Sequence, residues 1–444
     1  MALIQPQASD TEQTGSDNPP VEVIQSRTLK VLMSSQVFGG MGLVAGYIPA
    51  ALLAQEITGS ATLAGLAAAM LSVGTTGASF PLASFMYRRG RRPGLGIGYL
   101  IAGLGAIAGF GAAMTSFYPL LLLGVTLIGV GNACNLAARY AAADLAAEHH
   151  RARSISMIVW ATTIGSASGS WVALAVATGA AAALGLPALS GPYALSLFVF
   201  IGAAVIVQTR LRPDPLVVAG GLKLGPRTES KRAELRRATG LILSSPRARL
   251  AVGAMITSQV VMVGVMTMTP LHMNEGRQAT STIGLMMMFH ILGMYAFSPI
   301  IGLLADRFGR LPMITIAAVI LVVGAEAAAR TPAPQSGGVM AGNFLIGLGW
   351  GFGVIAGSTL LTESFPVADR VSVQGAADLI MSGFGAAGGL AAGTIVATSS
   401  YANLCRYAMA FAATLLVAIA WHRIQQGRGE GQGPQPELQF NIGS

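Results

Sequence analysis

Charged residues are scarce in this chain. They make up 10% of its 444 residues, whereas about 25% is usual in soluble proteins. Cysteine is limited to Cys134 and Cys405, which excludes a scaffold held together by a disulfide framework. The chain also has no glycine-rich phosphate loop with Lys and no spacing typical of a catalytic nucleophile. We therefore expect neither ATP hydrolysis nor another enzymatic activity, and no bound cofactor.

Hydrophobic residues, in contrast, make up 53% of the chain, and 57 residues are glycine. A transmembrane helix needs about 20 consecutive apolar residues, and small residues allow such helices to pack closely. The net charge of +9 comes mainly from short links between apolar runs, which is typical of membrane proteins rather than of a nucleic-acid-binding surface. The composition predicts a protein that crosses a lipid bilayer repeatedly and binds no nucleic acid.

The apolar runs predict an all-α fold with twelve transmembrane helices. Because this number is even, both ends of the chain should lie on the same side of the membrane. The expected spans are 30–54, 60–86, 94–114, 118–142, 153–181, 191–209, 249–272, 280–304, 312–329, 338–362, 371–397 and 403–423.

The links between these runs predict the orientation. Ten Lys or Arg lie between Arg210 and Arg249, whereas the links on the opposite side contain little beyond Arg277 and Arg330. Basic links favour the cytoplasm, so the termini and the long middle link should be cytoplasmic. We expect a disordered tail at 1–28, a six-helix half at 29–209, a link at 210–248, a second half at 249–424 and a tail at 425–444.

An internal repeat supports this division into two halves. A constant offset of 219 residues, the separation of Arg88 from Arg307, superimposes several features without gaps. The pairs are Arg88 with Arg307, Gly90 with Gly309, Arg91 with Arg310, Pro93 with Pro312, Asp144 with Glu363, and Arg151 with Arg370. Two homologous six-helix halves are typical of transporters that work by alternating access.

The link after the eighth run reads GLLADRFGR at residues 302–310. It resembles the G-x-x-x-D-R-x-G-R motif of the major facilitator superfamily, which lies between helices 2 and 3 and recurs in weaker form between helices 8 and 9. In this chain the second copy is the fuller one, because Ala83 and Tyr87 stand where the first copy should have Gly and Asp. With the helix count and the repeat, the resemblance covers nearly the whole chain, and it implies a secondary transporter.

Both copies of this motif are predicted to act in gating. An Asp at a helix end can accept charge-assisted hydrogen bonds from a neighbouring helix in one conformation and lose them in the other. The alternative is that the arginines only anchor the cytoplasmic side of the helices. The predicted gating residues are Arg88, Gly90, Arg91, Gly302, Asp306, Arg307, Gly309 and Arg310.

Three ionisable residues within the runs are candidates for coupling transport to an ion. Asp378 has no basic neighbour at helical spacing, so it either binds a proton or cation or forms an interhelical hydrogen bond. Glu326 is followed four residues later by Arg330, which favours a surface ion pair. Arg139 lies near the inner end of the fourth run, where proton-linked members of the superfamily often carry a functional Arg. Pairing with Asp144 is its alternative role.

Soft side chains recur at helical spacing in the seventh and eighth runs. Met262 and Met266 should share one helical face, as should His290 and Met294. If the two helices are adjacent, these four residues form a ladder roughly 12 Å long. Thioether and neutral imidazole groups suit Cu(I). An adaptable apolar cavity built from Met is the alternative.

The paired motifs M-x-x-x-M and H-x-x-x-M resemble those of bacterial copper importers within the superfamily, a subgroup that is also similar to riboflavin transporters. The resemblance implies a monomer in the bacterial inner membrane, with a metal ion or small molecule as cargo. Copper import is the leading hypothesis, with Met268, His272 and Met273 as an outer funnel. Riboflavin-like solute transport, multidrug efflux and a non-transporting receptor are the alternatives.

Overall fold

The computed structural model describes residues 20–222 and 230–430, which contain helices and no β-strand. The main helices of the two halves are α1 (Val21–Thr58), α2 (Ala61–Arg89), α3 (Arg91–Thr115), α4 (Tyr118–Ala141), α5 (Arg151–Trp171), α7 (Ser190–Arg210), α10 (Pro246–Glu275), α11 (Thr280–Tyr295), α12 (Ser298–Phe308), α13 (Arg310–Arg330), α14 (Gly337–Glu363), α15 (Val367–Thr398) and α16 (Tyr401–Glu430). The remaining elements are η1 (Glu148–His150), η2 (Val172–Ala177), α6 (Thr178–Ala183), α8 (Pro215–Val218) and α9 (Lys231–Ser244).

Twelve spans in this part of the chain are long and apolar enough to cross a membrane, which confirms the predicted number. Most spans extend beyond the predicted bounds because polar residues continue the helix past the apolar run. Residues 21–28 and 425–430 are helical, although both were predicted to belong to terminal tails. Residues 1–19 and 431–444 lie outside the described part. The middle link, predicted as a plain connector, contains α8 and α9.

Local sequence signals set several helix ends. The Ser60 side chain accepts a hydrogen bond from the Leu63 amide at the start of α2, and Ser245 does the same for Ala248 at the start of α10. Gly59, which ends α1, has φ of 66°, a conformation that glycine adopts without strain. The eighth span is interrupted between α11 and α12 next to Pro299, whose ring nitrogen has no hydrogen to donate.

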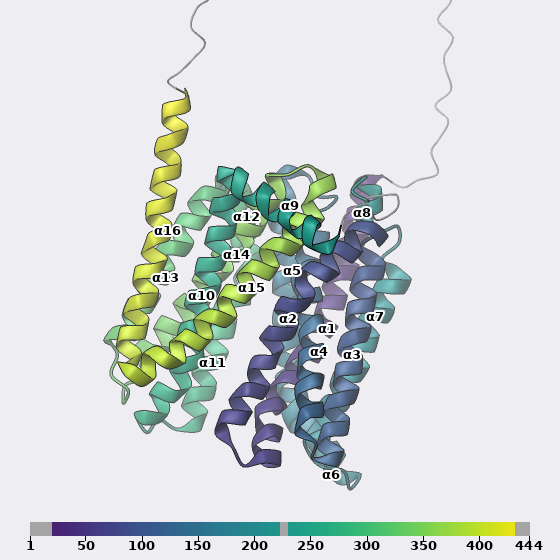
Figure 1. Cartoon of the computed structure of the whole chain (residues 1–444), viewed down its shortest axis with the longest axis vertical. Helices are drawn as coiled ribbons and strands as arrows, with labels where there is room; N and C mark the ends of the chain where they lie inside the picture. The colour runs from purple at the N-terminus through teal and green to yellow at the C-terminus, as the bar shows by residue number, and fades with distance from the viewer. Residues whose placement is uncertain (1–19, 223–229, 431–444) are drawn as a thin grey trace, which may run out of the picture.

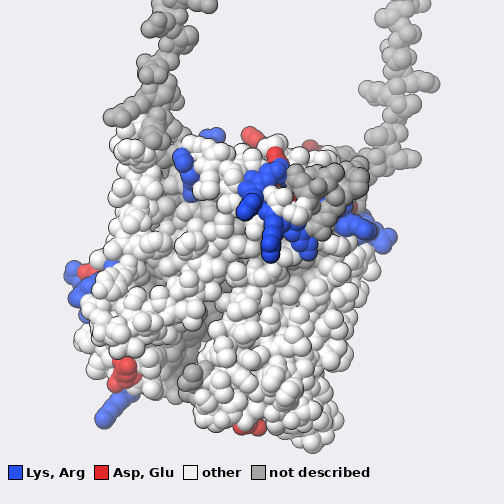
Figure 2. All heavy atoms as spheres, in the orientation of Figure 1, with Lys and Arg blue, Asp and Glu red and all other residues white. Residues whose placement is uncertain are grey.

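The helices form two bundles that stand side by side, α1–α7 in the first half and α10–α16 in the second (Figure 1). Both described chain ends and α9 lie at the same end of the molecule. Figure 2 shows a dense group of Lys and Arg side chains at this end, which we call the basic end, and a hollow between the halves on the side away from it. The chain is therefore strongly asymmetric in charge along the helix direction.

The two halves touch mainly through two helix pairs, α2 with α15 and α5 with α12. Each half has its own apolar core, and the cores merge where these pairs meet. Ala152 and Ile155 of α5 belong to the core of the second half, while Val371 of α15 belongs to that of the first. These residues lie near the helix ends at the basic end, so the halves are joined there.

Candidate gating and coupling site

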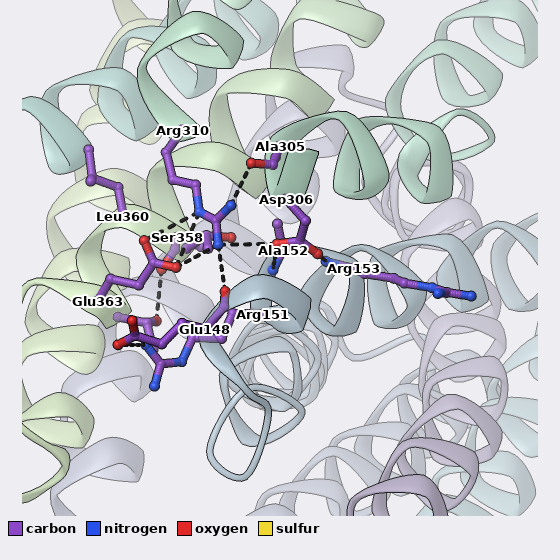
Figure 3. Close-up of polar contacts among 12 residues, drawn as sticks. Glu148, Arg151, Ala152, Arg153, Ala305, Asp306, Arg310, Ser358, Leu360 and Glu363 are labelled. Atoms are coloured by element: carbon purple, nitrogen blue, oxygen red, sulfur yellow. Dashed lines mark hydrogen bonds and ion pairs between the residues drawn. The ribbon is translucent and has the colours of Figure 1, made fainter. Parts of the chain in front are cut away.

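The second copy of the motif joins the two halves at the end of α12. The Asp306 carboxylate accepts hydrogen bonds from the backbone amides of Ala152 and Arg153, at 3.1 and 2.9 Å. These amides lie in the first turn of α5, a helix of the other half. Amides in the first turn of a helix have no hydrogen-bond partner within that helix. The helix dipole also favours a negative charge at this position. Figure 3 shows Asp306 directed at the start of α5, in the arrangement predicted for a gating residue.

Arg310 completes this contact. Its guanidinium pairs with Glu363 of α14 at 2.6 Å and with Asp306 at 3.1 Å. It also donates to the backbone carbonyl oxygen of Glu148, across the boundary between the halves, at 2.8 Å (Figure 3). One arginine thus holds two acids of its own half and a carbonyl group of the other half. We call these residues, with the first turn of α5, the α5–α12 latch.

The first copy of the motif makes a similar contact with different residues. Arg91 pairs with Asp144 through two hydrogen bonds, at 2.8 and 3.1 Å, and donates a third to Gln374 of α15 at 2.8 Å. Gln374 belongs to the second half, so Arg91 also links the halves. Burial raises the pKa of Asp144, while the charge of Arg91 acts to lower it.

The remaining motif residues have mainly backbone roles. Gly90 and Gly309, which are counterparts in the repeat, have φ of 98° and 89°, where a side chain would introduce strain. Gly302 packs so closely on α5 that an added Cβ would lie 2.1 Å from the Ser156 hydroxyl oxygen. Arg307 is exposed and stacks on its neighbour Phe308. Arg88 is half-buried, and its buried Nε has no hydrogen-bond partner in the described residues.

Arg139 and Asp378 form an ion pair across the boundary between the halves, from α4 to α15. Their side chains are 2% and 5% exposed. The Tyr140 hydroxyl donates to the same carboxylate oxygen at 3.3 Å, and Arg139 donates to the Ser358 hydroxyl at 3.1 Å. The prediction that Arg139 pairs with Asp144 is wrong, because Asp144 is held by Arg91. Asp378 has no basic neighbour at helical spacing, and its basic partner comes instead from a helix of the other half.

Glu326, the third coupling candidate, pairs with Arg330 at 2.5 Å on one face of α13. The Arg330 side chain is 79% exposed, so the predicted surface ion pair is confirmed. Nothing in this pair connects α13 to the boundary between the halves.

The soft residues of α10 and α11 do not meet as the predicted ladder. These helices touch only slightly, because α14 packs along both of them. The His290 ring donates from Nδ1 to the Asn343 carbonyl oxygen of α14 at 2.7 Å, and Met294 packs against Gly347 of α14. Met262 is buried and Met266 half-buried in the apolar core of the second half. The assumption that α10 and α11 are adjacent is therefore wrong.

The predicted outer funnel residues lie in packed surroundings. The His272 ring stacks on Tyr401 with centroids 4.1 Å apart. Met273 is fully buried in a small cluster with Met286 and Val339, and Met268 packs against the main core of the second half. These three residues do not share one lining.

Comparison with known proteins identifies the family. The family model of the Major Facilitator Superfamily matches residues 31–288 and 272–443. The chain belongs to this superfamily. It is 36% identical to the uncharacterized MFS-type transporter YdeG of Bacillus subtilis (strain 168) over 402 residues, which cover 90% of this chain and 93% of that protein.

Two further proteins are similar to this superfamily transporter at greater distance. The riboflavin transporter RfnT of Brucella anthropi is 26% identical, with 88% of this chain and 95% of RfnT covered. The crystal structure of the human organic anion transporter MFSD10 (TETRAN) superposes with a TM-score of 0.69 and 14% identity, covering 90% of this chain and all of that one. The second likeness shows the fold alone.

Sequence reasoning missed several residues of this transporter that join the halves, among them Gln374, Tyr140 and Ser358. The repeat contained a signal for Ser358, because it is the counterpart of Arg139 at the offset of 219 residues. Residues that share a repeat position can meet across the axis that relates the halves. No comparable signal marked Gln374, which lies one turn before Asp378 and faces a different arginine.

Proposed function

We propose that this transporter is a proton-coupled carrier of a small organic solute, with Asp378 as the proton-binding group. The observation that carries the proposal is the buried ion pair between Arg139 and Asp378, which joins the two halves within the membrane-spanning part. Buried ionisable groups in such a position are expensive to keep and are typical of proton relays. We also infer, from the distribution of basic residues, that the basic end faces the cytoplasm.

The pair can link a proton to the movement of the halves. In the described conformation Arg139 neutralises Asp378, and the contacts that join the halves lie toward the basic end. Opening this end would separate α4 from α15 and leave Asp378 buried without its counter-charge. Such a charge costs several kcal/mol, so the carboxylate would take up a proton instead. Protonation would therefore favour the conformation open at the basic end.

An aromatic and amide group in the second half supports an organic cargo. The Trp350 indole of α14 donates to the Gln259 amide oxygen of α10 at 2.8 Å, and Tyr295 of α11 lies edge-on to Trp350 with centroids 5.5 Å apart. Aromatic faces with a few polar atoms are typical of sites for flat organic ligands. The similarity to the riboflavin transporter RfnT supports a flavin-like solute.

Uptake of radiolabelled riboflavin into proteoliposomes tests this proposal. An inward proton gradient should stimulate uptake by the wild-type transporter. The Asp378→Asn variant should lose this stimulation and still exchange internal for external riboflavin, because its carboxamide cannot take up the proton. Glu326→Gln, which removes a carboxylate at the surface of α13, is the control. Unaltered stimulation in Asp378→Asn would contradict the coupling role, and absence of riboflavin flux in the wild type would contradict the cargo.

Copper import remains a second candidate because of the His290 ring. Its Nδ1 must carry the hydrogen that is donated to the Asn343 carbonyl oxygen, so Nε2 keeps its lone pair. This Nε2 is buried and has no hydrogen-bond partner in the described residues. A neutral imidazole nitrogen oriented by a backbone carbonyl is suited to bind a soft metal ion.

Copper uptake by the Met262→Leu variant, measured in proteoliposomes, tests this second candidate. The substitution preserves apolar volume and should destabilise the fold by less than about 1.5 kcal/mol. If Met262 binds Cu(I), copper uptake should fall sharply in this variant. Met255→Leu, a change at a fully buried position of the same helix, should leave it intact. Equal copper uptake in both variants, or none in the wild type, would rule out a copper role for Met262.

A further inference from the structure

The first copy of the motif lacks its acid, and an acid from another part of the chain occupies the same interface. Glu234 lies in the first turn of α9, in the link between the halves, and is 3% exposed. Its carboxylate accepts a hydrogen bond from the Ser84 hydroxyl of α2 at 2.6 Å and one from the Ser372 hydroxyl of α15 at 3.0 Å. A single carboxylate therefore bridges the two halves.

The internal repeat shows that the contact made by Glu234 corresponds to the contact made by Asp306. Asp306 binds the backbone amide of Arg153 in the first turn of α5. The repeat counterpart of Arg153 is Ser372, whose hydroxyl binds Glu234. Asp306 itself corresponds to Tyr87, one turn beyond Ser84 on α2. The two carboxylates thus bind equivalent positions of the repeat, Asp306 near the start of α5 and Glu234 near the start of α15.

Neighbouring residues fix α9 in this place. Arg237, one turn after Glu234, pairs with Asp369 of α15 at 2.6 Å and interacts with the hydroxyl of Tyr87. Ala238 and Ile242 of α9 are buried in the core of the second half. The helix is therefore anchored to α15 and reaches the end of α2, so its acid is held between them.

We propose that Glu234 is a gating residue that replaces the missing acid of the first motif copy. In the closed state at the basic end it holds α2 to α15, as Asp306 holds α12 to α5. Opening requires Glu234 to lose at least one of its two hydrogen bonds, since Ser84 and Ser372 lie on different halves; because α9 is anchored to α15, we expect the bond to Ser84 to break. The link between the halves therefore acts in the conformational change as well as connecting the chain. This inference depends on alternating access only, and not on the cargo or on Asp378.

Cysteine accessibility at the interface tests the proposal without cargo or proton gradient. The reporter is Ser79→Cys, in a chain with Cys134→Ala and Cys405→Ala. Ser79 is 6% exposed on α2 and its carbonyl oxygen lies against Gly375 of α15, so its labelling reports separation of the two helices. Glu234→Gln should raise the rate of labelling by a polar maleimide about tenfold, the size expected for hydrogen bonds to a charged group.

A control and a second reporter separate gating from simple anchoring of α9. Glu22→Gln removes an exposed carboxylate in the first turn of α1, at the same end, and should leave labelling unchanged. A reporter at Ala238→Cys, which is buried on α9, detects release of this helix. If Glu234→Gln exposes the Ala238→Cys reporter while Ser79→Cys labels at the wild-type rate, Glu234 is only an anchor and the proposal is wrong.

Variants at the serines keep the test valid if Glu234→Gln does not fold. Ser84→Ala combined with Ser372→Ala removes both donors while keeping the carboxylate. This variant should also raise labelling of the Ser79→Cys reporter, and a wild-type rate in a folded protein would overturn the proposal. In the opposite direction, Tyr87→Asp restores the acid of the motif. Combined with Glu234→Gln, it should return labelling toward the wild-type rate.

Discussion

The two interfaces at the basic end, α5 with α12 and α2 with α15, have the same design with different residues. In the first, the acid Asp306 lies within the motif, and Gly302 allows close approach to Ser156. In the second, the motif has Ala83 in place of glycine, and the glycine lies on the opposite helix, where an added Cβ on Gly375 would meet the Ala83 side chain at 2.1 Å. Close approach needs one glycine per crossing, and either helix can supply it.

The interfaces also differ in how deeply their arginines are buried. Arg91 and Asp144 have side chains that are 1% and 0% exposed, whereas Arg310 and Glu363 are 10% and 23% exposed. Removing one partner of a fully buried pair leaves an uncompensated charge, while a partly exposed partner can be solvated. Loss of Arg91, in the degraded first copy of the motif, should therefore destabilise the protein more than loss of Arg310.

The largest effect is expected from removing these arginines. Arg91→Ala should lower the free energy of unfolding by about 3–5 kcal/mol, and Arg310→Ala by about 1–3 kcal/mol, since solvent can reach Glu363. Thermal unfolding of the purified variants in detergent measures the ranking. An equal or larger loss in Arg310→Ala would show that burial does not determine the difference.

The stability of Arg91→Ala should also depend on pH. Burial raises the pKa of Asp144, and Arg91 is the main group that opposes this shift. In the variant the folded state binds a proton more readily than the unfolded chain, so stability rises as the pH falls through the raised pKa. The wild type should show less of this dependence.

A smaller effect is expected from Asp306→Asn, which removes the charge at the start of α5 and keeps the side-chain volume. The closed state at the basic end should become less favourable, by about 1.5–3 kcal/mol. Turnover should therefore fall while the affinity for cargo stays close to that of the wild type, because Asp306 contacts the start of α5 and Arg310 rather than the Trp350 group. Flux and equilibrium binding assays separate these quantities, and a loss of affinity at unchanged turnover would contradict a gating role.

The smallest effect should come from moving the glycine of the α2–α15 crossing. Gly375→Ala alone forces two Cβ atoms together and should cost about 1–3 kcal/mol through overpacking. Combined with Ala83→Gly, the crossing regains its space with the glycine on α2, and most of the loss should be recovered. Unfolding measurements on the single and double variants test this. If the double variant is no more stable than Gly375→Ala, the two crossings are not equivalent.

The fold could be predicted from the sequence because its signals are local. Apolar runs set the helix count, and the repeat set the division into halves. The contact of Asp306 with a neighbouring helix was predictable because a motif of adjacent residues marks it. The helices of the middle link were missed because α9 is charged and its apolar residues are few, so no long run reveals it.

The contacts that join distant helices could not be predicted in the same way. Arg139 and Asp378 are 239 residues apart, and nothing near either one indicates the other. The Met and His pattern failed for a related reason, because helical spacing gives the face of each helix and not the identity of its neighbour. Here the neighbour of His290 is Asn343 of α14.

Arg139 and Ser358 are the same position of the repeat, and they touch. In a symmetric pair of identical chains, a residue on the two-fold axis faces its own copy. Two identical six-helix subunits would place arginine against arginine here, or serine against serine. They would also have the same residue at the repeat position that is Val159 in the first half of this chain and Asp378 in the second. The ion pair of Arg139 with Asp378 therefore depends on two halves that differ in sequence, and a pair of identical subunits could not form it.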